Sequence, residues 1–295
     1  MIFILEEVRA GGLLLGLAVG DALGAPLEGL PPQAVTVREM RGGGIHGLPP
    51  GSLTDDTLQA AAVARSLVAC RGFAPGDLTR RLLEGYLRHP DLFGPTSAGV
   101  FTLLLQGVPP EQAPARVHRI RGGSRSNGAV MRGLPLALMF TPPALDVASL
   151  ACSRITHHDP VAGTCSQAVN RMAADLARGM PREQALLRAV AACPPGEVRE
   201  ILSRWDAIEP VASLDAVTLT HCAVRVFLEA ESFEEAVVRA VNLGGDTDTA
   251  GAVTGALAGA CWGIRAIPER WLDALRDGPA LLGLARDLWL ASRPA

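Results

Sequence analysis

Residues 11–24 read GGLLLGLAVGDALG, and residues 247–263 read TDTAGAVTGALAGACWG. Each stretch has a glycine at every fourth position, namely Gly12, Gly16, Gly20 and Gly24 in the first and Gly251, Gly255, Gly259 and Gly263 in the second. A glycine inside a helix costs about 0.5–1 kcal/mol relative to alanine. A row of glycines spaced by four leaves a flat stripe on one helix face, along which another helix can lie very close. Tight core packing is the simplest use of these stripes. We further expect the two helices to pack side by side, with the residues before Gly251 close to residues 20–24.

Apolar residues recur with helical spacing through much of the remaining chain. The pattern covers residues 58–70, 97–106, 129–140, 161–178, 183–192, 213–230 and 233–242. Alternation typical of strands is hard to find, and aromatic residues make up only 4% of the chain. The sequence therefore predicts an all-α fold. Its Pro-rich spots are short and spaced like turns between helices, so we expect a single domain over residues 1–295.

The composition excludes several classes of protein. The 295 residues are 48% apolar and 19% charged, which is enough for a large core and gives no sign of disorder. The net charge of -3 provides no basic field for a phosphate backbone, which argues against nucleic acid as the main partner.

The cysteines and the start of the chain indicate a cytoplasmic protein. The six cysteines lie far apart without a CxxC motif, so we expect small buried residues in a reducing compartment. The first 24 residues are apolar but include Glu6, Glu7, Arg9 and Asp21, which argues against a signal peptide or a membrane-spanning helix. No membrane partner is expected.

The first of two acidic clusters is Thr54-Asp55-Asp56, which stands directly before an apolar helical run. Thr54 is a natural N-cap, and the two aspartates occupy the first turn, where the helix dipole favours carboxylates. Taken alone, this motif is explained equally well as a capped helix start.

The second cluster, Asp246-Thr247-Asp248-Thr249, contains more acidic oxygen than a cap requires, because a cap uses one side-chain oxygen. In an extended turn, Asp246 and Asp248 would point to the same side. Carboxylates crowded at a buried helix entrance repel each other unless a cation lies between them. Ligands that are all oxygen suit Mg²⁺ or Mn²⁺ and disfavour zinc. Two such clusters predict a site for two divalent cations with one bridging aspartate.

In these motifs the chain resembles the ADP-ribosylglycohydrolase family. The matching segments, in chain order, are GLAVGDALGAPLEG at 16–29, SLTDDT at 52–57, SNGAVMRGLPLAL at 126–138, THHDP at 156–160 and NLGGDTDTAGAVTGALAG at 242–259. The resemblance implies a compact domain of orthogonally packed helices around a central dinuclear metal cleft. It also implies a metal-dependent hydrolase that cleaves the glycosidic bond between ADP-ribose and an acceptor, with ADP-ribose as the product ligand. The expected substrate is a mono-ADP-ribosylated protein, with arginine as the first choice of acceptor, or a small ADP-ribose conjugate.

The resemblance assigns roles to individual residues. It implies six metal ligands, with Asp248 as the bridge: Thr54, Asp55, Asp56, Asp246, Asp248 and Thr249. Glu28 matches a mobile glutamate near the metals and is our candidate for the general base or for a gate, while Asp55 or Asp56 would orient the attacking water. The implied ADP-ribose contacts are Gly123, Ser124, Arg125, Ser126, Asn127 and Gly128, with His157 beside them. Arg125 stands where relatives carry an aromatic residue that stacks on the ligand, so the mode of adenine binding is open.

Two other functions compete with this interpretation. The pair His158-Asp159, with His157 beside it and His118 upstream, would suit an HD-type metal phosphohydrolase. That chemistry needs the pair inside a helix, whereas Pro160 favours an extended Asp159, and it leaves both acidic clusters unused. The second alternative is a catalytically silent ADP-ribose-binding homologue, against which the complete set of metal ligands argues.

Overall fold

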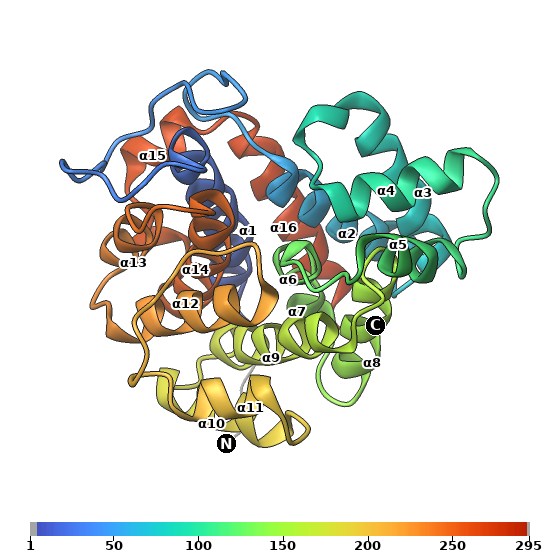
Figure 1. Ribbon diagram of the computed structural model, residues 1–295. Coiled ribbons are helices and arrows are strands. Elements are labelled where there is room, and N and C mark those ends of the chain that lie inside the picture. Colours follow the sequence, from blue (N-terminus) through green and yellow to red (C-terminus); the bar gives the residue numbers. More distant parts are fainter. Residues whose placement is uncertain (1–4, 294–295) are drawn as a thin grey trace.

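The computed structural model describes residues 5–293. These residues form sixteen α-helices and three short 3-10 helices, and no β-strand occurs among them, which confirms the all-α prediction (Figure 1).

The centre of the fold is the pair α1 (Glu7–Gly24) and α14 (Thr247–Trp262). The helices run antiparallel, and their glycine stripes face each other, pairing Gly12 with Gly259, Gly16 with Gly255, and Gly20 with Gly251. A Cβ atom built on the first member of each pair would lie only 2.2, 2.2 and 1.9 Å, respectively, from the carbonyl oxygen of its partner. This backbone contact confirms the expected side-by-side packing and explains why both helices accept the cost of glycine.

The segment Glu7–Leu27 is long and apolar enough to cross a membrane, by length and composition alone. Its most apolar window is entirely buried inside the fold. Since a helix in the middle of a helical protein needs apolar residues on every side, its central position accounts for this composition.

The remaining helices of the same half surround this pair. α14 is flanked by α12 (Ala216–Glu229), α13 (Phe233–Val241) and α9 (Pro160–Ala177), while α1 contacts α16 (Gly278–Ala291). The short elements here are η1 (Ala25–Leu27), η3 (Ile264–Ala266) and α15 (Glu269–Ala274).

The other half of the molecule lies across from α1 and α14 and is built from residues 55–121 (Figure 1). Its elements are α2 (Asp55–Cys70), α3 (Pro75–Arg88), η2 (Pro90–Leu92), α4 (Pro95–Leu105) and α5 (Ala113–Arg121). Between and below the halves lie α6 (Gly128–Met131), α7 (Leu136–Met139), α8 (Ala144–Arg154), α10 (Arg182–Ala192) and α11 (Glu197–Ser203).

Two predicted helices need correction. The single helix expected over residues 129–140 is wrong: α6 and α7 are separated by a turn that contains Pro135, whose ring nitrogen cannot donate a hydrogen bond. The helix expected from residue 213 begins at Ala216, because the Asp215 carboxylate accepts hydrogen bonds from the backbone of Val217 and Thr218 and caps it. The other predicted helices are confirmed to within three residues at their ends. Six helices have no predicted counterpart: α3, α5, α8, α11, α15 and α16.

One large cluster of buried apolar side chains includes residues from both halves of the molecule, and a small second cluster lies between α4 and α5. This shared core is why we propose a single domain. All six cysteines are free, and four of them are buried as expected, whereas Cys70 is exposed and Cys261 is half-buried.

Candidate active site

The two acidic clusters meet where α2 and α14 begin. Thr54 caps α2 by accepting a hydrogen bond from the backbone N–H of Asp56 at 3.3 Å. Across the junction, the Thr249 hydroxyl donates to Oδ2 of Asp56 at 3.2 Å. Motifs almost two hundred residues apart therefore touch directly, at the end of the glycine contact between α1 and α14.

Asp21, on α1, holds the first cluster in place. It is fully buried, and its carboxylate accepts from the backbone N–H and the hydroxyl of both Thr54 and Thr57. Because the Thr54 hydroxyl donates its proton to Asp21 at 2.8 Å and accepts one hydrogen bond from the Asp56 backbone, one lone pair of that oxygen remains available to a cation. Sequence reasoning did not assign Asp21 to the site. The sequence feature that could have indicated its role is an acidic residue within an apolar helix, because a buried carboxylate needs hydrogen-bond partners.

The second cluster is positioned by the turn at Gly244-Gly245. Both glycines have φ of +79°, in the left-handed region, and a Cβ on Gly245 would lie 2.3 Å from the carbonyl oxygen of Ala212. Gly245 also accepts a backbone hydrogen bond from Gly29 at 2.8 Å, which brings Glu28 beside the cluster. The turn thus requires glycine for both conformation and space.

Carboxylates in the centre form two groups of three, in which each residue offers one oxygen and these oxygens lie within 4.8 Å of one another. One group contains Asp21, Asp56 and Asp248, and the other contains Glu28, Asp246 and Asp248. Asp248 belongs to both groups, so its carboxylate lies where a bridging ligand would have to be. Among residues 5–293, no arginine lies within ion-pair distance of these five carboxylates or of Asp55.

The crowding changes the acidity of the carboxyl groups. Burial raises the pKa of Asp21 to about 6 and that of Asp55 to about 7. Burial, followed by the charges of neighbouring acids, raises the pKa values of Asp56 and Asp248 well above the usual range and that of Glu28 to about 7. Without a cation, such a centre has to take up protons at neutral pH.

The donor atoms fit a hard divalent cation. All are carboxylate or hydroxyl oxygens, the ligand type that Mg²⁺ and Mn²⁺ prefer. Oδ1 of Asp56 is buried and has no hydrogen-bond partner within the described residues, and the buried Oε2 of Glu28 has no hydrogen bond there, with Nε2 of His46 at 3.6 Å. Buried oxygens without a partner are costly, and a bound cation would satisfy them.

Two amide side chains orient the candidate ligands from behind. Gln59 donates to Oδ2 of Asp55 at 2.7 Å and accepts from the buried Arg132 guanidinium at 3.1 Å. Because arginine can only donate, Arg132 fixes the orientation of the Gln59 amide, whose N–H must face Asp55. Asn127 donates to Oδ2 of Asp246 at 2.6 Å.

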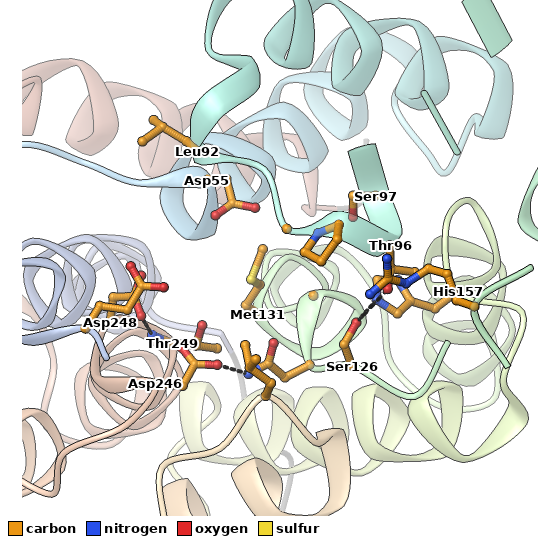
Figure 2. A pocket seen from close by; sticks show the side chains of 17 residues that line it. Asp55, Leu92, Thr96, Ser97, Ser126, Met131, His157, Asp246, Asp248 and Thr249 are labelled. Carbon is orange, nitrogen blue, oxygen red and sulfur yellow. Dashed lines mark hydrogen bonds between the residues drawn. The ribbon is translucent and has the colours of Figure 1, made fainter. Parts of the chain in front are cut away.

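A cavity of about 270 Å³ lies beside the carboxylates (Figure 2). Its wall includes Glu28, Asp55, Asp246, Asp248 and Thr249 at the acidic end. Thr96, Ser97, Ser126 and His157 lie at the other end, as Figure 2 shows. Leu92, Met131 and Leu214 contribute apolar surface. Of the loop expected to wrap ADP-ribose, Ser126, Asn127 and Gly128 line the cavity, whereas Gly123, Ser124 and Arg125 do not.

His157 is buried and neutral. Its Nε2 lies 2.8 Å from the Ser126 hydroxyl and its Nδ1 lies 2.8 Å from the Thr156 hydroxyl. Burial lowers its pKa well below the usual value. A Cβ on Gly128 would lie 3.1 Å from the imidazole ring, so the loop needs a small residue there.

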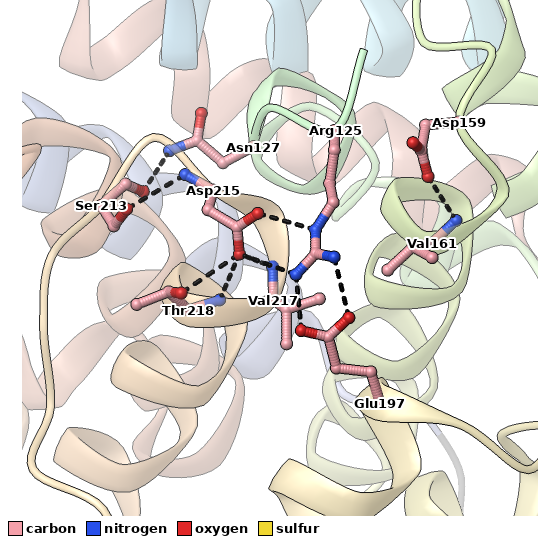
Figure 3. A network of polar contacts seen from close by, with 9 residues as sticks. All are labelled: Arg125, Asn127, Asp159, Val161, Glu197, Ser213, Asp215, Val217 and Thr218. Carbon is pink, nitrogen blue, oxygen red and sulfur yellow. Dashed lines mark hydrogen bonds and ion pairs between the residues drawn. The ribbon is translucent and has the colours of Figure 1, made fainter. Parts of the chain in front are cut away.

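Arg125 points away from the cavity, into a network of charged groups (Figure 3). Its guanidinium binds the Glu197 carboxylate through two hydrogen bonds of 2.8 and 2.6 Å, and its Nε lies 2.7 Å from Oδ2 of Asp215. The backbone of the same loop is paired with residues 214–216, since Asn127 donates to Leu214 and Ala216 donates to Arg125. Arg125 therefore fastens the loop to α11 and α12.

Of the histidines named for the competing phosphohydrolase interpretation, His118 and His158 lie outside this centre, whereas His157 lines the cavity. Asp159 has an extended backbone, as expected before Pro160, and its carboxylate caps α9 by accepting from Val161 at 2.8 Å. His158 packs edge-on against His118, and neither ring lines the cavity.

Comparisons with known proteins agree with this geometry. The family model described as ADP-ribosylglycohydrolase matches residues 5–295. The chain is 33% identical to an ADP-ribosyl-[dinitrogen reductase] glycohydrolase from Rhodospirillum rubrum, over 94% of this chain and 96% of that protein. It is 30% identical to the ADP-ribosylarginine hydrolase Tri1 of Serratia proteamaculans, over 95% of this chain and 79% of that protein. A solved structure titled ADP-ribosylglycohydrolase-related protein complex superimposes with a TM-score of 0.85 at 37% identity, covering 97% of this chain and 99% of that one.

Proposed function

Because this chain belongs to the ADP-ribosylglycohydrolase family and is a glycohydrolase, we propose that it hydrolyses the bond between ADP-ribose and an arginine side chain of a modified protein, using two divalent cations. The observation that carries this proposal is the pair of carboxylate groups that share Asp248, buried beside a cavity and without a balancing arginine.

The proposed cation ligands come from both clusters: Thr54, Asp55, Asp56, Asp246, Asp248 and Thr249. When bound, Mg²⁺ or Mn²⁺ would polarise the ribose hydroxyls and lower the pKa of a water molecule. The protein supplies the orientation. Gln59 holds Asp55, and Asn127 holds Asp246, so these side chains are fixed before substrate binds.

Glu28 is the proposed general base. Its carboxylate lines the cavity and offers an oxygen within 4.8 Å of oxygens of Asp246 and Asp248, so it would lie beside a water molecule held by the proposed cations. Asp55 also faces the cavity and would orient the attacking water (Figure 2).

We propose arginine as the acceptor because two relatives act, by their names, on ADP-ribosylated dinitrogen reductase and on ADP-ribosylarginine. Small ADP-ribose conjugates contain the same ADP-ribosyl group and form the second class of substrate to test.

Asp248→Asn is the decisive variant. It removes the shared carboxylate charge with little change in volume, so we expect a folded protein that has lost both Mg²⁺ binding and hydrolysis of an ADP-ribosylarginine peptide. Titration calorimetry with Mg²⁺ and release of ADP-ribose would measure these losses. Full activity of this variant in EDTA would contradict the two-cation proposal.

His158→Ala is the matched control. It should keep Mg²⁺ binding and activity, whereas the HD-type alternative predicts that it loses both. Turnover by the wild type that disappears in Asp55→Ala would exclude a silent ADP-ribose binder.

A further inference from the structure

The charges on the cavity wall are unevenly distributed. Four carboxylates, from Glu28, Asp55, Asp246 and Asp248, lie at the end where α2 and α14 begin. The opposite end has hydroxyl groups and the neutral His157 (Figure 2). Among the wall residues there is one permanent cation, Arg121.

Arg121 belongs to the end away from the carboxylates. It is the last residue of α5, which packs against α4, and the first residues of α4, Pro95, Thr96 and Ser97, line that end. After Arg121 the chain turns at Gly122, where φ is +70°, and continues into the loop that supplies Ser126. The start of α4 adds the positive end of its helix dipole to the same region.

The Arg121 guanidinium is available to a ligand. The side chain is exposed and makes no hydrogen bond or ion pair within residues 5–293. Arg125, four residues later, is occupied by Glu197 and Asp215. Of the two arginines near the loop, only Arg121 can meet a molecule bound in the cavity.

We propose that Arg121 binds the pyrophosphate of the ADP-ribosyl substrate and so acts as a specificity-determining residue; this rests on the function proposed above. The ribose hydroxyls face the proposed cations at the acidic end, so the pyrophosphate of the same molecule lies further along the cavity, toward the end that Arg121 lines. A guanidinium offers a planar set of donors that matches phosphate oxygens in pairs. The proposed cations and Arg121 therefore contact different parts of the substrate and together orient it in the cavity.

The test compares Arg121→Ala with Arg119→Ala. Arg119 is an exposed arginine on the same helix that does not line the cavity, so it controls for the loss of one surface charge. Loss of a charge-assisted pair with phosphate is expected to raise the Kd for ADP-ribose and the KM of an ADP-ribosylarginine peptide about 10-fold. The kcat should stay unchanged, since the pair exists equally in the ground and transition states. Arg121→Lys should fall between the alanine variant and the wild type.

Salt provides a second readout. Raising NaCl from about 0.05 to 0.3 M should weaken ADP-ribose binding by the wild type and by Arg119→Ala, and weaken it less in Arg121→Ala. Unchanged ADP-ribose affinity in Arg121→Ala, an equal loss in Arg119→Ala, or an unchanged salt dependence would overturn the assignment. A wild-type protein that neither binds nor releases ADP-ribose would instead overturn the proposed function.

Discussion

The backbone contact between α1 and α14 makes a sharp prediction for Gly12→Ala. The new methyl group would lie 2.2 Å from the Gly259 carbonyl oxygen, whereas real Cβ atoms essentially never come closer than 3.0 Å. Because the opposing atom belongs to the backbone, no side-chain rotation can relieve the clash, and the helices have to move apart by on the order of 1 Å.

The expected cost lies at the upper end of the range for overpacking, about 3 kcal/mol. It is only partly offset by the better helix propensity of alanine, about 0.5–1 kcal/mol. For a chain of this size, about 2–4 °C is lost per kcal/mol, so Tm should fall by about 5 °C or more. Thermal unfolding followed by circular dichroism would measure the change.

Gly11→Ala is the matched control on the adjacent residue. A Cβ at Gly11 would lie 3.5 Å from the side chains of Ile264 and Leu282, which is ordinary van der Waals contact. This variant should be neutral or slightly more stable, because it gains helix propensity without a clash. Equal Tm values for the two variants would refute the backbone contact as the reason for the glycine stripe.

Two further predictions concern the charged groups. Burial raises the pKa of Asp21 from 3.8 to about 6 and that of Asp55 from 3.8 to about 7. The stability that these two groups contribute to the metal-free protein is therefore fully present below about pH 4, where both are protonated in the folded and unfolded states. As the pH rises through 6 and 7 the folded protein loses this stability, on the order of 4 kcal/mol for Asp55. Mg²⁺ should therefore raise Tm more at pH 8 than at pH 5, and an equal rise at both pH values would contradict the buried acidic centre. Arg125→Ala should weaken ADP-ribose binding about fivefold by loosening the loop, at a cost of only about 1 kcal/mol in the free energy of unfolding, because its partners are partly exposed. Calorimetry and chemical denaturation check this, and Arg80→Ala, which breaks exposed ion pairs on α3, should leave ADP-ribose binding unchanged.

Local patterns were sufficient to predict the central helix pair and the two acidic clusters. Glycine spacing and charge crowding are properties of short segments, and each carries its own physical requirement. Helix α3, which has no predicted counterpart, buries only Leu78 and Leu82, so its apolar stripe is narrow.

The residues that escaped prediction depend on distant parts of the chain. Asp21 acts on Thr54 across 33 residues, and the role of Arg125 depends on Glu197, which is 72 residues away. Neither spacing nor composition reveals which of two nearby arginines faces a cavity. That distinction between Arg121 and Arg125 required the three-dimensional arrangement of α5, α11 and α12.

The glycine stripes alone leave the register of α1 and α14 undetermined. Because both stripes repeat every four residues, the helices could slip by one repeat, about 6 Å along the axis, and still place glycine opposite glycine. Polar contacts at the active-site end distinguish these registers. The Thr247 hydroxyl donates to the Gly24 carbonyl at 3.0 Å, and the Thr249 hydroxyl donates to Asp56 on α2, which Asp21 holds against α1. A slip would break the first contact and carry Asp248 away from Asp56. Contacts at the candidate metal centre therefore select one register from a repeating interface: Thr247 fixes α14 against α1, and the proposed ligand Thr249 fixes it against α2.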